Sequence, residues 1–175
     1  MLPDWTIEPL DADGYPPEDG ETYRENALVK ARFGRSVGPP DAWMLGEDSG
    51  IEVDGLGGAP GHHAARFGGN DPVARLLEAL AGVEGDGRRA RYVCELVAIS
   101  PAGEERSGRG ELAGRIASEP RGSEGFGYDP IFVPDGEERT VAELGDAWKR
   151  GHSHRARAAR ALRDAAGAAE EPGAR

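Results

Sequence analysis

The order of apolar and polar positions along the chain alternates between the spacing of a strand and the spacing of a helix. Residues 90–99 are apolar on both faces, which predicts a buried central strand. Other strand patterns are expected at 5–10, 42–47, 51–54, 105–116 and 131–133. Helices are expected at 23–33, from 72 to a stop at Gly82, at 140–149 and at 154–166.

All four expected helices carry a start signal, and Ser153 is the expected cap of the last one. Thr22 and Glu25 have the spacing of a capping box, in which the threonine accepts from a first-turn amide and the glutamate reaches back. Thr140 and Glu143 repeat that spacing. Asp71 precedes a proline, which is the favoured order of cap and first helical residue.

The composition suits one globular domain over residues 1–175, with a frayed tail at 167–175. Hydrophobic residues make up 38% of the chain, which argues against disorder, and a net charge of -11 disfavours nucleic-acid binding. No apolar stretch approaches membrane-spanning length, so no membrane partner is expected. The single Cys94 excludes a disulfide framework, and the N-terminus lacks a signal-peptide pattern, so we expect a cytoplasmic location.

Glu47 and Asp48 are adjacent acids that directly follow the apolar run 42–45. Two carboxylates at the end of a buried strand are costly unless a positive group lies near them. A metal-bound phosphate substrate would explain both their charge and their position. Asp48 is then a candidate ligand of Mg²⁺ and a candidate proton acceptor for an attacking water, and Ser49 is a candidate donor to a phosphate oxygen. The alternative is that residues 46–50 form only a turn.

A second candidate segment begins at Glu25. Lys30 lies four residues after Asn26 and therefore on the same face of the expected helix. Taken alone, Glu25 is explained equally well as the second residue of the capping box, and Lys30 as a solvated lysine.

Residues 120–130 form a third candidate segment, in which two aromatic residues alternate with glycines ahead of Asp129. An exposed Phe126 can stack on a base, and glycines let the backbone approach a flat ligand. A carboxylate can accept from the N–H groups of such a ligand. The alternative is an ordinary loop with a buried phenylalanine.

A fourth segment joins two expected helices, with Lys149 at the end of one and His154 and Arg155 in the first turn of the next. Cations in a first turn oppose the helix dipole, so stability alone does not explain them. The guanidinium of Arg155 offers donors suited to a keto oxygen and a ring nitrogen.

Together, these segments resemble the inosine triphosphatase family, pyrophosphatases that act on purine nucleoside triphosphates with damaged bases. The matching stretches are 22–31, 47–61, 65–67, 90–94, 120–132, 140–144 and 153–155. The resemblance implies an α/β fold with two lobes around a long, twisted mixed β-sheet, flanking helices, a substrate cleft between the lobes, and a homodimer.

The resemblance also implies roles by position. Asp48 would be the proton acceptor and a metal ligand, with Glu25 as a second metal-binding acid. Ser49 would contact the substrate, and Lys30 and Lys149 would neutralise phosphates. The implied base pocket consists of Phe126, Gly127, Tyr128 and Asp129, with His154 and Arg155 reading the purine 6-keto oxygen.

The implied reaction is Mg²⁺-dependent hydrolysis of ITP, dITP or XTP to the monophosphate and pyrophosphate, which clears these nucleotides from the pool. The family begins with an apolar strand and a (Ser/Thr)-x-Asn-x-x-Lys loop, and we expect both to be missing here, because Met1 aligns beyond them. Two alternatives follow: a shortened, non-catalytic nucleotide-binding relative, and a Mg²⁺-dependent phosphatase that releases orthophosphate.

Overall fold

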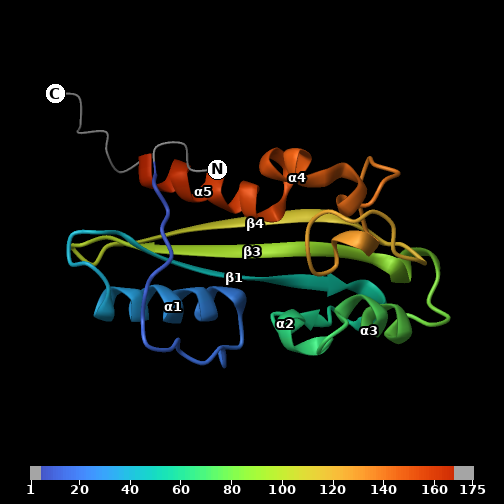
Figure 1. Cartoon of the computed structure of the whole chain (residues 1–175), viewed down its shortest axis with the longest axis horizontal. Coiled ribbons are helices and arrows are strands. Elements are labelled where there is room, and N and C mark those ends of the chain that lie inside the picture. Colours follow the sequence, from blue (N-terminus) through green and yellow to red (C-terminus); the bar gives the residue numbers. More distant parts are fainter. Residues whose placement is uncertain (1–4, 168–175) are drawn as a thin grey trace. The chain divides into compact units, whose positions relative to one another are not determined.

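The structure is a computed structural model, and it describes residues 5–167. Five helices and three short 3-10 helices accompany five strands in this part of the chain (Figure 1). In chain order the elements are α1 (Tyr23–Val37), β1 (Met44–Val53), η1 (Asp54–Leu56), β2 (Pro60–Gly61), α2 (Ala64–Phe67), α3 (Pro72–Ala79), η2 (Gly85–Arg88), β3 (Arg89–Ile99), β4 (Glu105–Ile116), η3 (Asp129–Ile131), β5 (Phe132–Pro134), α4 (Val141–His152) and α5 (His154–Gly167).

The five strands form one sheet in the order β2-β1-β3-β4-β5. β1 pairs antiparallel with β2, and β4 pairs antiparallel with β5. β3 and β4 are joined by a tight turn, in which the Ser100 N–H donates to the Glu104 carbonyl at 2.9 Å. The α/β class with flanking helices is confirmed, but the sheet is antiparallel instead of mixed.

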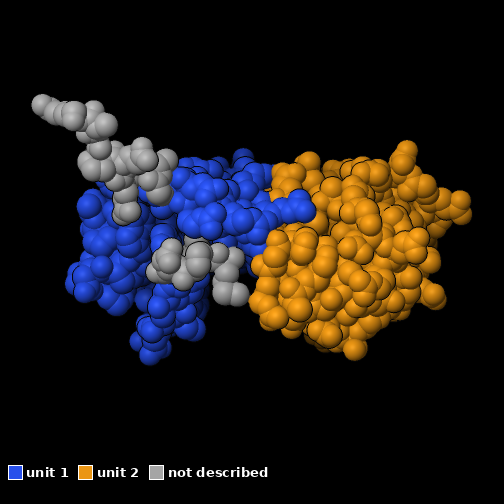
Figure 2. All heavy atoms as spheres, turned by 90° about the horizontal axis from the view of Figure 1, so that it is seen from above, with its two compact units in different colours: residues 1–48, 94–110, 155–175 blue, residues 49–93, 111–154 orange. Residues whose placement is uncertain are grey.

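The chain divides into two compact units (Figure 2). Unit 1 takes its described residues from Met1–Asp48, Cys94–Gly110 and Arg155–Arg175, and unit 2 consists of Ser49–Val93 and Glu111–His154. Each of the strands β1, β3 and β4 has one part in unit 1 and the other part in unit 2.

Unit 1 has two apolar clusters, one on each side of its sheet segment, with α1 and α5 on opposite sides (Figure 1). Along β3, successive side chains point to opposite faces. Val97 and Ile99 therefore pack with α1 at Ala27 and Ala31. The other face of the strand packs with α5, in a cluster that includes Cys94, Leu96, Ala98, Ala158 and Leu162.

Unit 2 has one larger apolar cluster. Its buried members include Ile51, Leu76, Leu80, Tyr92, Ile116 and Phe132, and Trp148 of α4 packs against it while partly exposed. The rings of Tyr92 and Phe132 lie 4.4 Å apart between centroids, a distance at which aromatic pairs attract. This cluster supports the loop that leads into η3.

Most expected elements are confirmed, including β4 at its exact bounds and the capping box at Thr140, where both reciprocal hydrogen bonds form. Three predictions were wrong. Residues 5–10 are not a strand, and 42–47 and 51–54 are one strand, β1. At the first box, Glu25 accepts from the N–H of Glu21 in place of that of Thr22. The expected tail at 167–175 lies almost wholly outside the described residues.

Candidate active site

Helix α1 lies unusually close to strand β1 in unit 1, and Gly46 is the reason. A Cβ at this position would lie 2.0 Å from the Ala27 carbonyl oxygen, which no side chain could tolerate. Because side chains alternate along a strand, Asp48 points to the same face as Gly46, toward α1. The glycine thus brings the helix close enough for its polar side chains to reach the Asp48 carboxylate.

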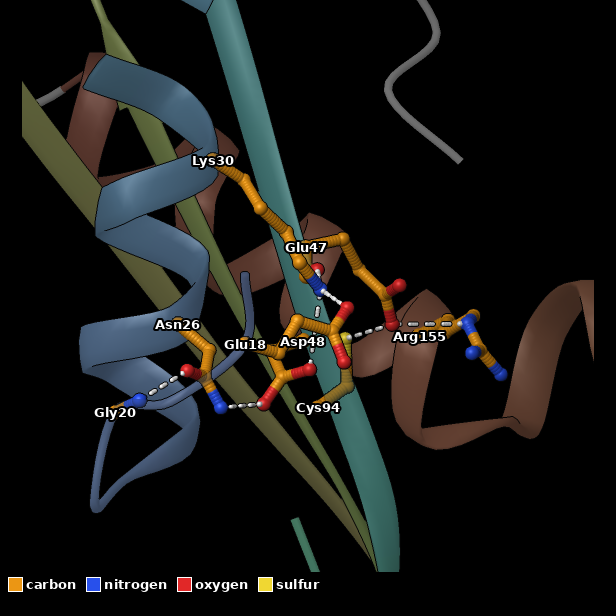
Figure 3. Close-up of polar contacts among 8 residues, drawn as sticks. All are labelled: Glu18, Gly20, Asn26, Lys30, Glu47, Asp48, Cys94 and Arg155. Carbon is orange, nitrogen blue, oxygen red and sulfur yellow. Dashed lines mark hydrogen bonds and ion pairs between the residues drawn. The ribbon is translucent and has the colours of Figure 1, made fainter. Parts of the chain in front are cut away.

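Asp48 is 4% exposed, and two side chains of α1 donate to it (Figure 3). Nδ2 of Asn26 lies 3.1 Å from Oδ2, and Nζ of Lys30 lies 3.2 Å from Oδ1. Asn26 is itself buried and accepts from the N–H of Gly20 at 2.9 Å. Burial raises the pKa of Asp48, although Asn26 and Lys30 each act to lower it. A carboxylate with these surroundings is a plausible proton acceptor.

The ammonium of Lys30 lies among three oxygens. It is 2.6 Å from Oε1 of Glu18, 2.8 Å from the Glu47 carbonyl oxygen and 3.2 Å from Oδ1 of Asp48 (Figure 3). Burial lowers the pKa of Lys30, but Glu18 and Asp48 together raise it by more, so the pKa lies above its ordinary value. Lys30 is therefore positively charged at neutral pH and is not a solvated lysine.

Glu47 points to the opposite face of β1 from Asp48, as alternation along a strand requires. Its Oε1 lies 3.1 Å from Nε of Arg155 and 3.6 Å from Sγ of the buried Cys94 (Figure 3). Burial, and then the charge of Glu47, raises the pKa of the Cys94 thiol. The two adjacent acids therefore have separate cationic partners, Lys30 and Arg155. Neither lies in a turn after the strand, because both are inside β1.

A second polar group lies in unit 2 around Asp129, which is 5% exposed. Its Oδ2 accepts from the Phe126 N–H at 2.9 Å and from Nζ of Lys149 at 2.7 Å, and its Oδ1 accepts from the Tyr92 hydroxyl at 3.3 Å. Nζ of Lys149 also lies 4.5 Å from the centre of the Phe126 ring. Phe126 is 64% exposed, so its ring is available to a ligand, as the expected stacking role requires.

The remaining expected residues have these positions. His154 is buried and stacks on Tyr92, with ring centres 4.6 Å apart. The Tyr128 hydroxyl donates to the Ala64 carbonyl at 3.1 Å, so Tyr128 anchors the loop 120–128 to α2. The preceding residue, Gly127, has a positive φ. Ser49 is partly exposed on β1.

Two of the expected residues make contacts that the resemblance did not imply. Lys149, expected at phosphates, contacts the residues expected around the base. Glu25, expected to bind metal, accepts from the backbone of Glu21 at the start of α1. The acid that approaches Asp48 through a shared cation is Glu18.

Sequence reasoning did not assign roles to Glu18, Asn26 or the side chain of Glu47. The spacing of Asn26 and Lys30 on one helical face was visible and predicts that Asn26 shares the environment of Lys30. Nothing in the local pattern singles out Glu18, because it lies in a loop rich in acids and prolines.

The residues described include no group of three or more His, Cys, Asp or Glu side chains placed to hold a metal ion. The oxygens around Lys30 are nevertheless of the type that hard divalent cations prefer: two carboxylates and a backbone carbonyl. No helix within residues 5–167 is long and apolar enough to cross a membrane.

The model of the Ham1 family matches residues 2–165, and the chain belongs to the Ham1 family. The family resemblance expected from the motifs is thereby confirmed.

Similar proteins agree with this membership. The chain is 51% identical over 146 residues to a dITP/XTP pyrophosphatase of Symbiobacterium thermophilum, covering 81% of this chain and 72% of that protein. It is 45% identical over 151 residues to one of Bdellovibrio bacteriovorus, covering 83% and 75%. A crystal structure of a nucleoside-triphosphatase, dITP/XTP pyrophosphatase, from Mycobacterium abscessus matches with a TM-score of 0.72 at 39% identity, covering 87% of this chain and 80% of that one.

Proposed function

We propose that the protein hydrolyses non-standard purine nucleoside triphosphates, namely dITP, XTP and ITP, to the monophosphate and pyrophosphate. The names of relatives at 45% and 51% identity over most of the chain support this reaction and these substrates. The observation within the molecule that carries the proposal is the buried Asp48 carboxylate, held by Asn26 and Lys30.

The residues around Asp48 would perform the chemistry on the phosphate chain. Asp48 would accept a proton from the water that attacks the α-phosphorus, and the bond to the pyrophosphate leaving group would break. Lys30, which is charged and close to Asp48, would offset charge on phosphate oxygens. Ser49, next along β1, would donate to a phosphate oxygen.

We propose Mg²⁺ as the cofactor, with Asp48 and Glu18 as its ligands. Their carboxylates already converge on one cation, the Lys30 ammonium, so the donor set fits a hard divalent ion. When bound, Mg²⁺ would polarise phosphoryl oxygens and neutralise their charge. The Glu25 carboxylate remains the other candidate for the second acid, and the two are separated by mutation below.

Unit 2 would recognise the base. Phe126 would stack on it, and Asp129 would accept from a ring N–H. Gly127 and Tyr128 would shape the loop around it. His154 and Lys149 of this unit remain candidates for the donors that a 6-keto oxygen needs, and Arg155 of unit 1 stays a candidate by the family resemblance alone. Adenine carries a 6-amino group, which would leave such donors without acceptors and be rejected.

The proposal is tested by incubating the purified chain with ITP and Mg²⁺ and assaying pyrophosphate and orthophosphate separately. We expect pyrophosphate to be released, with ATP turned over at least about tenfold more slowly. Asp48→Asn should abolish turnover, while Asp41→Asn, a change at an exposed aspartate, should not. Orthophosphate as the first product would favour the phosphatase alternative. ITP binding without turnover in the unaltered chain would favour a non-catalytic nucleotide-binding protein.

We further propose a homodimer, for which the family resemblance is the support. Light scattering coupled to size-exclusion chromatography would give the mass of the particle directly. A mass equal to one chain of 18.5 kDa would contradict the dimer.

A further inference from the structure

We infer that Glu124, which has no role in the reaction proposed above, is a positioning residue that holds Lys149 and Phe126 in register. The inference concerns the site assigned to the base and therefore rests on the proposed function. All the residues concerned lie in unit 2, in the loop 121–129 and helix α4.

Helix α4 is interrupted at Gly145, whose φ of 81° and ψ of 175° are not helical. A backbone break of this kind leaves the first amides of the following turn without their regular helical acceptors. The Glu124 carboxylate replaces one of them, because its Oε2 accepts from the Asp146 N–H at 3.1 Å. Glu124 therefore caps the second segment of α4, residues 146–152, from a loop more than twenty residues earlier.

The break and the cap depend on each other. A Cβ at position 145 would lie 2.8 Å from Oε2 of Glu124, so with any residue other than glycine there the carboxylate would have to move. The positive φ favours glycine at the same position. Gly145 thus ends the first helical segment, and Glu124 caps the second.

Lys149 lies three residues after Asp146 and so within the first turn of the capped segment. Its ammonium lies 2.7 Å from the Asp129 carboxylate and 4.5 Å from the centre of the Phe126 ring. Phe126 itself follows Glu124 by two residues, and its N–H donates to Asp129. Glu124 therefore links the loop that carries Phe126 to the helical segment that carries Lys149, and Asp129 links the same two parts through its own contacts.

A third contact joins the start of the loop to the N-terminus of α4. The buried Thr140 hydroxyl, at the N-cap of α4, donates to the Arg121 carbonyl at 2.7 Å. This tie fixes the first segment of α4 but cannot fix the second, because Gly145 separates them. Glu124 is exposed, so its contribution lies in orientation and not in burial.

The test compares Glu124→Ala with Glu124→Gln, whose amide oxygen still accepts an N–H, and with Glu119→Ala as a control at another exposed glutamate between β4 and β5. We expect Glu124→Ala to raise KM for ITP about fivefold and leave kcat within about twofold, the size expected from loss of one cap. Glu124→Gln should restore KM to within about twofold of the unaltered chain, and Glu119→Ala should leave it unchanged.

A second readout does not depend on turnover. Hydrogen–deuterium exchange at the amides of 146–149 should accelerate in Glu124→Ala but not in Glu124→Gln or Glu119→Ala. If the unaltered chain hydrolyses no purine triphosphate, the proposed function fails while this exchange still tests the cap. Equal exchange in all four proteins, or a loss of kcat without a change in KM, would overturn the inference.

Discussion

Asn26 donates to the Asp48 carboxylate across 3.1 Å, and both side chains are almost completely buried. The same amide accepts from the Gly20 N–H through its other end, so Asn26 connects the loop before α1 with the strand β1. Two buried polar groups this close are stable only because each satisfies the other. This pair, more than any single acid, defines the surroundings in which Asp48 would act.

Asn26→Ala should damage both activity and stability. The Asp48 carboxylate would lose a donor that lowers its pKa, and the Gly20 N–H would lose its acceptor. We expect kcat/KM at neutral pH to fall about tenfold and the free energy of unfolding to drop by about 1–3 kcal/mol, the cost of leaving a buried group unsatisfied. Urea unfolding and steady-state kinetics measure these, with Ser36→Ala, at an exposed site on α1, as the control. Normal stability in Asn26→Ala would contradict the argument.

The pH dependence follows from the raised pKa of Asp48. Burial is its main cause, and a proton acceptor works only when ionised. Activity should therefore fall as pH is lowered through this pKa, which places the acid limb of kcat/KM above the ordinary value of 3.8. A limb at or below 3.8 would show that another group governs it.

The raised pKa of Asp48 affects stability in the opposite direction from activity, because its contribution to stability falls as pH rises. Because the folded-state pKa of Asp48 lies above the unfolded value, its contribution to stability is fully present below the unfolded pKa. That contribution is lost as pH rises through the folded pKa. Between the unfolded and the folded pKa of Asp48, the free energy of unfolding of Asp48→Asn should therefore rise relative to that of the unaltered chain. Urea titrations at successive pH values would detect this rise.

The sequence was informative wherever a signal was local. Capping spacing placed the starts of α1 and α4, and continuous apolarity identified β3 as buried. The fate of Glu47 and Asp48 was not local. Ser49 and Gly50 resemble a turn, but pairing within the sheet keeps them in β1, and strand alternation then sends the two acids to opposite faces. The kink at Gly145 was equally hidden, since an isolated glycine in a helical pattern is usually tolerated.

Glu18 and Glu25 are distinguished by mutation to glutamine. Glu18 shares the Lys30 ammonium with Asp48, whereas Glu25 accepts from a backbone N–H before α1. We expect Glu18→Gln to lower kcat/KM about tenfold or more and to raise the Mg²⁺ concentration for half-maximal rate. Glu25→Gln should change kcat/KM by less than about twofold and cost about 0.5 kcal/mol of unfolding free energy. The reverse pattern would assign the metal to Glu25.

The Cys94 thiol should be unreactive in the folded protein. It is fully buried, and burial together with the neighbouring Glu47 raises its pKa, so almost no thiolate forms at pH 8. Reaction with an aromatic disulfide reagent should be at least about a hundredfold slower than in urea-unfolded protein. Glu47→Gln, which removes one cause of the raised pKa, serves as the comparison. Rapid labelling of the folded chain would show that Cys94 is accessible.

Phe126 offers the clearest separation of binding from stability. Its side chain is 64% exposed and lies against the Lys149 ammonium, so little burial is lost when it is removed. If the ring stacks on the base, Phe126→Ala should raise KM for ITP about tenfold, in line with stacking worth about 1–3 kcal/mol per base. Phe126→Tyr keeps a π face and should remain within about threefold. Thermal unfolding should shift by less than about 2 °C in either variant, as for Val37→Ala, a change at another exposed apolar side chain. An unchanged KM in Phe126→Ala would remove Phe126 from the base site, and the Lys149–Asp129 pair would then have to recognise the base without a stacking partner.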